Sequence, residues 1–206
     1  MARETEALYG DSSDLNNVRD YTHIVDDRHF ARLKELLDDA VARGARCVTG
    51  GNSDTEDRVI APTILENVST DSALMQDEVF GPILSTLPYD NLDDVIEYVN
   101  THEKPLSLYL FTEEKDRIAT IMNRTTAGTT LINDTLVHFT HPTMPFGGVN
   151  DSGIGKAHGH AGFLAFTNER PTLRQHMKKP LLQKLYPPYT AATRRLTDLF
   201  FRYFKL

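Results

Sequence analysis

The sequence predicts an α/β protein with a partial, open and mostly parallel sheet flanked by helices. Three observations predict this class. Short apolar runs alternate with segments of helical periodicity between Ile83 and Ile132. The run Leu106 to Phe111 is almost entirely apolar, which is typical of a strand buried on both faces. A helix separates each of these strands from the next, and such connections favour parallel pairing in a single sheet.

The first part of the chain contains one amphipathic helix and several short extended segments. Apolar residues recur at helical spacing from residue 30 to residue 41, and Gly44 is placed to end this helix. Cys47-Val48 reads as a short strand. Residues 58–65 look extended, and Pro62 favours an edge or a strand end.

The middle of the chain supplies the predicted strand and helix alternation. Residues 83–87 form a strand candidate, and residues 92–100 form a short helix with Asn91 as its cap. A second helix is expected over residues 113–124, followed by a strand over residues 129–132. The residues of the second helix that we expect to point inward are Ile118, Ile121 and Met122.

Composition and charge narrow the function classes. The chain has 206 residues, of which 40% are hydrophobic and 25% charged, ordinary values for a soluble globular protein. A net charge of -7 argues against nucleic acid as a partner, because binding phosphates needs a basic surface. A single cysteine cannot form an internal disulfide, which fits a reducing compartment. The polar N-terminus lacks the apolar segment of a signal peptide, and no stretch is long enough to span a bilayer, so we expect a cytoplasmic location.

Glu78 and Phe80 stand in the motif Gln76-Asp77-Glu78-Val79-Phe80-Gly81-Pro82, ahead of an apolar strand. One interpretation is a plain turn, because turns need Gly and Pro and Glu usually lies at the surface. The other is a binding loop, in which the carboxylate accepts hydrogen bonds from ribose hydroxyls and the ring packs near a nicotinamide. Spacing alone leaves both open.

Residues 146–159 are rich in glycine but lack the surroundings of a dinucleotide-binding G-x-G-x-x-G motif. Tight turns beside a packed site are therefore favoured over a phosphate cradle. Mostly apolar walls with a few polar groups describe a small-molecule pocket. The apolar lining that we expect is Leu136, Val137, Phe139, Met144 and Phe146, and the polar groups are His138, His141, His158 and His160.

We expect no metal at these histidines, since they lack an H-E-x-x-H pattern and cysteine partners. No G-x-S-x-G elbow is present either. Cys47 follows Arg46, whose charge could lower the pKa of the thiol. A small buried hydrophobic residue is the favoured interpretation of Cys47.

Thr190 to Leu206 is helical in composition and carries an apolar stripe beside basic residues. Such a basic amphipathic helix can lie on a membrane surface. Docking onto the chain's own core or onto a partner subunit is favoured, because the helix is short and Phe-rich tails bury well. The stripe consists of Leu196, Leu199, Phe200, Tyr203 and Phe204, and the basic residues are Arg194, Arg195, Arg202 and Lys205.

A series of short motifs gives the chain a family resemblance that runs from about Tyr9 to Gln175. The motifs in order are Tyr9-Gly10, Arg28-His29-Phe30, Gly50-Gly51, Ala61-Pro62-Thr63, the Glu78 and Phe80 motif, Lys104-Pro105-Leu106-Ser107-Leu108-Tyr109, Asn133-Asp134, Pro145-Phe146-Gly147-Gly148-Val149 and Asp151-Ser152-Gly153-Ile154-Gly155. This order resembles the aldehyde dehydrogenase superfamily. The tracts His138-Phe139-Thr140 and Ala157-His158-Gly159 make the chain most similar to its class 3 and bacterial coniferyl aldehyde dehydrogenase branch.

The resemblance implies roles for seven residues. Glu78 would bind the nicotinamide ribose of NAD or NADP, and Phe80 would contact the nicotinamide ring. Asn133 would stand in the supporting shell of the active site. The residues that would line the aldehyde tunnel are Leu136, Phe139, Phe146 and His158.

The family oxidises an aldehyde to a carboxylate through a cysteine thiohemiacetal and thioester. By the resemblance, the nucleophilic cysteine, the general base, the oxyanion Asn and the Rossmann phosphate site all precede the matched region, and Cys47 does not match the nucleophile. No catalytic residue is therefore assigned. We expect this chain to be the C-terminal part of an enzyme for an aromatic or medium-chain aldehyde, and to be inactive alone.

The resemblance also suggests a domain division and partners. Residues 1–168 would belong to the catalytic domain, residues 169–178 would form an oligomerisation strand, and residues 179–206 would form a tail with the amphipathic helix. We expect a homodimer. An alternative is a catalytically silent subunit that pairs with a full-length relative, and a third interpretation is a remnant or misassigned start, which predicts poor folding.

Overall fold

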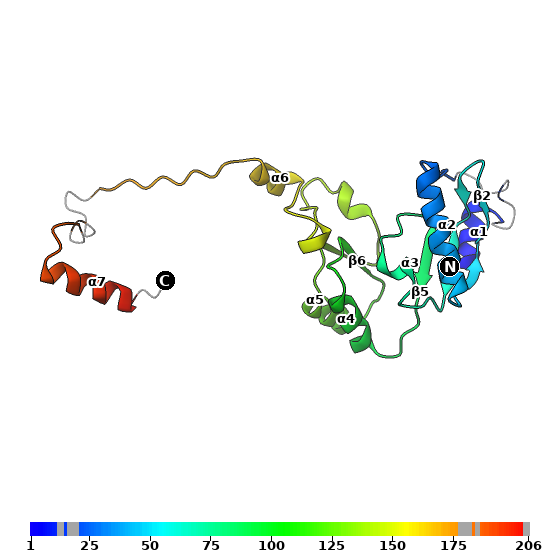
Figure 1. The fold of residues 1–206 in the computed structure, drawn as a ribbon, viewed down its shortest axis with the longest axis horizontal. Helices are drawn as coiled ribbons and strands as arrows, with labels where there is room; N and C mark the ends of the chain where they lie inside the picture. The colour runs from blue at the N-terminus through cyan, green and yellow to red at the C-terminus, as the bar shows by residue number, and fades with distance from the viewer. Residues whose placement is uncertain (12–14, 16–20, 177–182, 184–185, 204–206) are drawn as a thin grey trace. The chain divides into compact units, whose positions relative to one another are not determined.

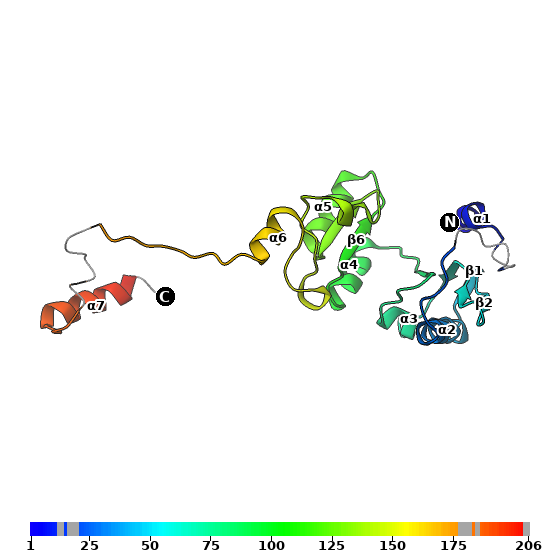
Figure 2. The same ribbon diagram turned by 90° about the horizontal axis from the view of Figure 1, so that it is seen from above.

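The computed structural model describes residues 1–206 except 12–14, 16–20, 177–182, 184–185 and 204–206 (Figures 1 and 2). Its contacts divide the chain into two compact units, Met1–Thr101 and His102–Leu206, which are described separately below. Helices and small sheets occur in both units, so the predicted α/β class is confirmed. Within the described residues, no helix is both long enough and apolar enough to cross a membrane.

The first unit contains a three-stranded mixed sheet and a two-stranded hairpin. In chain order its elements are α1 (Ala2–Tyr9), α2 (Asp27–Ala42), β1 (Arg46–Thr49), β2 (Ser53–Asp54), β3 (Val59–Ile60), β4 (Thr63–Glu66), α3 (Ala73–Gln76), β5 (Ile83–Thr86) and α4 (Leu92–Thr101). The sheet order is β1-β4-β5, with β1 antiparallel and β5 parallel to the central β4. β2 and β3 form the antiparallel hairpin.

The core of the first unit is built on α2. The Asp26 carboxylate caps this helix by accepting a hydrogen bond from the His29 backbone N–H at 2.7 Å. Gly44 follows its last turn with φ 98°, a conformation that favours glycine, so the predicted stop is confirmed. The buried side chains of α2 pack with Leu65 of β4 and Ile83 of β5. They are Phe30, Leu33, Leu36, Leu37 and Ala40, and each large one contributes about 1.5–3 kcal/mol by leaving water.

The second unit contains one parallel strand pair and irregular segments beyond it. Its elements are β6 (Ser107–Leu110), α5 (Lys115–Arg124), β7 (Thr129–Ile132), the 3-10 helices η2 (Val137–Thr140) and η3 (Asn150–Ser152), α6 (Gly159–Ala165) and α7 (Ala191–Tyr203). β6 and β7 pair in parallel, with Ser107 opposite Thr129, and α5 is the connection between them. This β6–α5–β7 unit is the predicted crossover.

The prediction of one parallel sheet through residues 83 to 132 is wrong in its strand order. β5 pairs with β4, where Ile83 lies opposite Thr63, whereas β6 pairs with β7 in a separate sheet. Pairing with β4 places Ile83 in the core under α2. A strand–helix–strand pattern shows that a crossover is allowed, but it does not show whether the two strands are neighbours.

Two burial predictions in the second unit are also wrong. β6 is only half-buried until Leu110, and the flanking Leu106 and Phe111 are exposed. The faces of a strand are covered by the elements that pack against them, so an apolar run alone does not guarantee cover on both faces. In α5, Ile118 and Ile121 are half-buried as expected, but Met122 is exposed.

The remaining predictions concern the C-terminal segments. Residues 169–176 form no strand in this structure, while 177 and 178 lie outside the described residues, so an oligomerisation strand and the three-part domain division stay predictions. α7 covers Ala191–Tyr203 of the predicted helix, and residues 204–206 lie outside the described part. Leu199 and Tyr203 of its apolar stripe are exposed. The choice between docking and membrane contact stays open.

Candidate functional site

The Glu78 loop, residues Asp77–Pro82, leaves α3 and enters β5. Ser72 caps α3 through its side chain, and Ser72 itself donates to the Asp39 carboxylate of α2 at 2.8 Å. Phe80 has a φ of 46°, a left-handed conformation that costs free energy in a residue with a bulky side chain. Gly81, the next residue, lies directly over the Leu33 side chain, and a Cβ added to Gly81 would lie 2.5 Å from that side chain. The loop therefore needs glycine next to Phe80.

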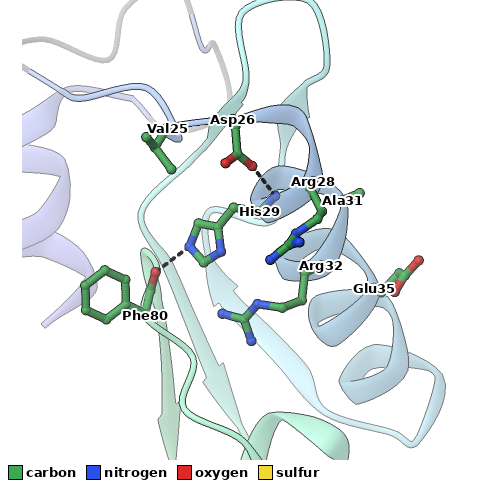
Figure 3. Close-up of a pocket in the computed structure, with 8 residues that line it drawn as sticks. All are labelled: Val25, Asp26, Arg28, His29, Ala31, Arg32, Glu35 and Phe80. Atoms are coloured by element: carbon green, nitrogen blue, oxygen red, sulfur yellow. Dashed lines mark hydrogen bonds between the residues drawn. The ribbon is translucent and has the colours of Figure 1, made fainter.

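Two side chains of α2 hold the loop by its backbone carbonyls. The Arg32 guanidinium donates to the carbonyl oxygens of Glu78 at 3.1 Å and Val79 at 2.5 Å. His29 Nε2 donates to the Phe80 carbonyl at 2.9 Å, the dashed contact in Figure 3. Three successive carbonyls are thus satisfied from one helix face, and the side chains of Glu78 and Phe80 are left free to point outward.

A pocket of about 590 Å³ lies between α2 and Phe80 (Figure 3). Its lining is Val25, Asp26, Arg28, His29, Ala31, Arg32, Glu35 and Phe80. The Phe80 ring is 78% exposed, and Figure 3 shows it projecting away from α2, so it is available to stack on a planar group. Glu78 is exposed and its side chain is not part of this lining.

A second hollow of about 400 Å³ shares Val25, His29 and Phe80 with the first. It is lined on its other side by Tyr9 and Tyr21, whose rings meet edge to face at a centroid distance of 5.5 Å. Burial, with a smaller contribution from Tyr9, raises the pKa of Tyr21 to about 12. Phe80 is thus exposed between two hollows, which supports the binding-loop interpretation over a plain turn.

Sequence reasoning missed the roles of His29 and Arg32. His29 belongs to one of the motifs that carry the family resemblance, yet no function was assigned to it. Arg28 and Arg32 stand four residues apart on α2 and therefore share a face. That spacing was the available signal for a basic helix face at a site.

The other predicted site residues all lie in the second unit. Asn133, with φ 58°, ends β7 and clamps Thr112 beyond the end of β6. Its Oδ1 accepts from the Thr112 N–H at 2.8 Å, and its Nδ2 donates to the Thr112 carbonyl at 3.0 Å. Asn133 therefore locks the ends of the two strands together, which agrees with a supporting position.

Leu136 and Phe139 belong to the Leu136 turn, residues Leu136–Thr140, which includes η2. Leu136 is 61% exposed and Phe139 is 50% exposed. His138, between them in sequence, is the buried side chain of η2 and not the polar group at a pocket surface that the sequence suggested. The turn thus presents two apolar side chains outward and one imidazole inward.

Phe146 and His158 are brought together by a backbone bridge. Phe146 and Ala157 exchange two backbone hydrogen bonds, of 3.1 and 2.8 Å. As a result the rings of Phe146 and His158 stack, with centroids 5.6 Å apart and planes inclined by 21°. Two of the four residues predicted for the tunnel are therefore in direct contact.

The glycine-rich segment is packed backbone against backbone. A Cβ on Gly148 would lie 2.0 Å from the Ser152 carbonyl oxygen, and one on Gly128 would lie 2.5 Å from that of Gly147. Lys156 Nζ donates to the carbonyls of Gly128, at 2.8 Å, and Gly147. The tight turns of the favoured interpretation are confirmed, and Lys156 is occupied by the protein's own carbonyls.

Cys47 is exposed in β1, which corrects the expectation of a small buried side chain. Partial desolvation of its sulfur raises the pKa of the Cys47 thiol, opposite to the lowering that a neighbouring Arg46 suggested. Arg46 forms an ion pair with Glu66 across the β1–β4 pair. The sulfur donates instead to the Thr49 carbonyl at 3.2 Å. Among the described residues, no group of three or more His, Cys, Asp and Glu side chains is arranged to hold a metal ion.

Comparison with known proteins decides the family. The model of the aldehyde dehydrogenase family matches residues 1–171. The chain belongs to the aldehyde dehydrogenase family. Its relatives include family 3 members from Rattus norvegicus and Mus musculus, at 41% identity each, so the predicted branch is confirmed.

Three further proteins are similar to this chain over almost its whole length. The dimeric NADP-preferring aldehyde dehydrogenase of Rattus norvegicus is 38% identical over 93% of this chain and 41% of its own length. A protein named probable coniferyl aldehyde dehydrogenase from Pseudomonas aeruginosa is 37% identical over 95% of this chain and 41% of its own. The substrate-bound structure of Staphylococcus aureus AldH matches with a TM-score of 0.76 and 36% identity, over 97% of this chain and 42% of that one.

A solved NAD+ complex of an aldehyde dehydrogenase from Bacillus cereus matches with a TM-score of 0.66 and 27% identity. It covers 72% of this chain and 30% of the Bacillus cereus chain. The sequence therefore spans less than half the length of these relatives.

Proposed function

We propose that this chain supplies the nicotinamide side of the cofactor site and one wall of the aldehyde site in an NAD(P)-dependent aldehyde dehydrogenase. The observation that carries the proposal is the Glu78 loop. Its three carbonyls are tied to α2, and this leaves the Phe80 ring exposed beside a pocket of about 590 Å³. Such an arrangement suits a planar ring and its attached sugar.

The residues present fit the nicotinamide riboside part of NAD or NADP. Glu78 presents an exposed carboxylate, which accepts hydrogen bonds and can hold two ribose hydroxyls. Phe80 supplies a flat apolar face, and Arg32 fixes the loop that carries both. When bound, the nicotinamide ring supplies the acceptor for the hydride that leaves the aldehyde carbon. The relatives include one named NADP-preferring and one solved with NAD+.

The exposed apolar side chains of the second unit fit the aldehyde wall. Leu136 and Phe139 offer apolar contact, and the stacked Phe146 and His158 offer a flat surface with one polar edge. Apolar walls suit an aromatic or medium-chain aldehyde better than a charged one. In the reaction NAD(P)+ oxidises the aldehyde and water supplies the second carboxylate oxygen, so that the products are the carboxylate, NAD(P)H and two protons.

The nucleophilic thiol is not supplied by this chain. Its single cysteine is Cys47, whose raised pKa keeps it from being a ready thiolate and which is not part of the pocket lining at Phe80. We therefore expect the 206-residue polypeptide alone to produce no NAD(P)H with any aldehyde. Production that disappears on Cys47→Ser would overturn this proposal.

The first experiment is the intact mass and activity of the native polypeptide from its source cells. This chain matches 41% of the length of the dimeric rat relative. If it is a similar share of its own enzyme, the native polypeptide should have a mass of more than twice 23.2 kDa. That polypeptide should reduce NAD(P)+ with an aromatic aldehyde. Glu78→Gln should raise the KM for the cofactor about ten-fold, because it removes charge-assisted hydrogen bonds. The matched control, Glu113→Gln at an exposed position of the second unit, should leave the KM unchanged.

Pairing with another subunit is the second candidate, favoured by the rat relative that is named dimeric. In this hypothesis residues 169–178 add a strand to a second subunit, either a copy of the same polypeptide or a full-length relative. A native mass near 23.2 kDa, with the chain co-purifying with a full-length relative, would support the silent-subunit form. A monomer that ignores such a relative would count against it.

A further inference from the structure

Four aromatic rings from three separate segments of the second unit form a continuous contact. Tyr109 of β6 meets His138 of the Leu136 turn edge to face, with centroids 6.1 Å apart. His138 meets Phe146 at 5.3 Å, and Phe146 stacks on His158 at 5.6 Å. The contact runs from the parallel strand pair to two residues that are proposed to line the aldehyde site.

His138 is the buried member that joins the Leu136 turn to this contact. The His138 side chain is 5% exposed, whereas its neighbours Val137 and Phe139 are 52% and 50% exposed. Its Nε2 lies 3.1 Å from the hydroxyl oxygen of Ser107 on β6, and the two share a hydrogen bond. Its Nδ1 is buried and has no hydrogen-bond partner among the described residues. A buried imidazole with one nitrogen bonded and one unpaired costs free energy, so its presence calls for a reason beyond packing.

We propose that His138 is a positioning residue that sets the shape of the aldehyde wall. The inference rests on the proposed function. The imidazole fixes the Leu136 turn to β6 through Ser107, and its ring spaces that turn from Phe146. Because Leu136 and Phe139 flank it on the exposed side, any movement of His138 moves both of them relative to the Phe146–His158 stack. His138 itself does not touch the substrate, and it acts through these four side chains.

The test uses the native polypeptide with substitutions introduced at its own locus. His138→Ala removes both the ring and the hydrogen bond. His138→Phe keeps a ring between Tyr109 and Phe146 and loses only the bond to Ser107. Ser107→Ala removes the same bond from the other side. The matched control is His102→Ala, at an exposed histidine outside the ring contact.

The readout is the ratio of kcat/KM for a bulky aromatic aldehyde to that for a short aliphatic one. We expect His138→Ala to lower this ratio about ten-fold, mainly by raising the KM of the bulky aldehyde, because Leu136 and Phe139 would no longer be held in position. A ten-fold change corresponds to about 1.4 kcal/mol of binding free energy. His138→Phe should restore most of the ratio, and Ser107→Ala should lie between the two. A loss of folded protein would reduce both activities together and leave the ratio unchanged, so an unchanged ratio in His138→Ala overturns the proposal.

A second measurement separates this inference from the proposed function. If the native polypeptide from the source cells, with a mass of more than twice 23.2 kDa, reduces no NAD(P)+ with any aldehyde, the proposed function fails. NMR of the 206-residue chain then decides the role of His138. His138→Ala should shift the ring resonances of His158 and the backbone resonances of Leu136 and Phe139, whereas His102→Ala should not. Unshifted resonances in His138→Ala would show that the imidazole positions neither segment.

Discussion

The Glu78 loop and the Leu136 turn present exposed apolar side chains in the same way but are held in place by different forces. In the loop, Arg32 and His29 donate hydrogen bonds to three successive carbonyls. In the turn, a buried imidazole lies against the rings of Tyr109 and Phe146. The first is fixed by polar contacts at the surface of a helix, and the second by aromatic packing together with one hydrogen bond between His138 and Ser107.

This difference predicts how each region fails. Polar contacts between exposed or half-buried groups are weakened by salt and by pH. Close packing is insensitive to salt, but a single added methyl group cannot be accommodated without moving the backbone. The Glu78 loop, which we propose as the cofactor side, is therefore sensitive to salt and pH, whereas the Leu136 turn, which we propose as part of the aldehyde side, is sensitive to changes of volume.

The largest effect is expected where the second unit has no free volume. In Gly148→Ala the new Cβ would lie 2.0 Å from the carbonyl oxygen of Ser152, which is backbone and cannot rotate away. We expect a loss of about 3 kcal/mol in the free energy of unfolding, at the upper end for overpacking. Chemical denaturation measures it. The control, Gly162→Ala in α6, meets its nearest atom at 3.5 Å and should be neutral or slightly stabilising. Equal effects at both positions would refute the packing argument.

The next effect tests the apolar support beneath the Glu78 loop. Leu33 is fully buried and its side chain lies under Gly81. Leu33→Ala should lower the free energy of unfolding of the first unit by about 3 kcal/mol, through lost burial and a cavity. Val41→Ala on the same helix removes an exposed side chain and should cost less than about 0.5 kcal/mol. A similar loss in both variants would mean that α2 does not carry the core.

Local patterns predicted the elements well, because they depend on residues near one another in sequence. The stop of α2 at Gly44, the crossover through α5 and the strand at residues 129–132 all follow from local spacing and from the conformational freedom of glycine. The order of neighbouring strands in the sheet could not be predicted in this way, because β5 pairs with β4 and the paired residues lie twenty positions apart in sequence. Burial of β6 failed for the same reason, because cover depends on which elements pack against a strand.

Sequence motifs named the exposed Glu78 and Phe80 as candidate site residues, but they gave no role to the half-buried Arg32 and did not show that His138 is buried. Glu78 and Phe80 stand in a recognisable motif, and Phe139 belongs to the tract His138-Phe139-Thr140 that is typical of the family branch. Arg32 acts through the backbone carbonyls of Glu78 and Val79, which lie 46 and 47 positions further along the chain. No local pattern shows such a contact. His138 was expected at a pocket surface because histidine is polar, and only the fold shows that it faces inward.

Arg32 offers a direct test of the polar support of the Glu78 loop. Arg32→Lys keeps the charge but not the planar fork, so it should lose one of the two carbonyl contacts. We expect about 1 kcal/mol of stability to be lost, and faster amide hydrogen exchange at Val79 and Phe80. Lys34→Arg on the same helix, where the side chain pairs with Asp38, is the control and should change neither quantity. Unchanged exchange in Arg32→Lys would show that the loop holds its shape without the fork.

The smallest effect concerns Asp39, which links α2 to the start of α3 just before the loop. Its side-chain contacts with Arg43 and Ser72, with a further contact from the Ala73 N–H, hold the pKa of the Asp39 carboxyl below its usual value of 3.8. A carboxylate whose pKa is lower in the folded state stabilises the fold above pH 3.8, and this contribution is lost as the pH falls from there through the lowered value. Asp39→Asn should therefore be less stable than wild type at neutral pH, and the gap should narrow as the pH falls below 3.8. Thermal melts of both proteins across this range measure it, with Asp38→Asn as the control. A gap that stays constant with pH would mean that Asp39 acts as a neutral hydrogen-bond acceptor, and that charge plays no part in holding α3 and the loop behind it.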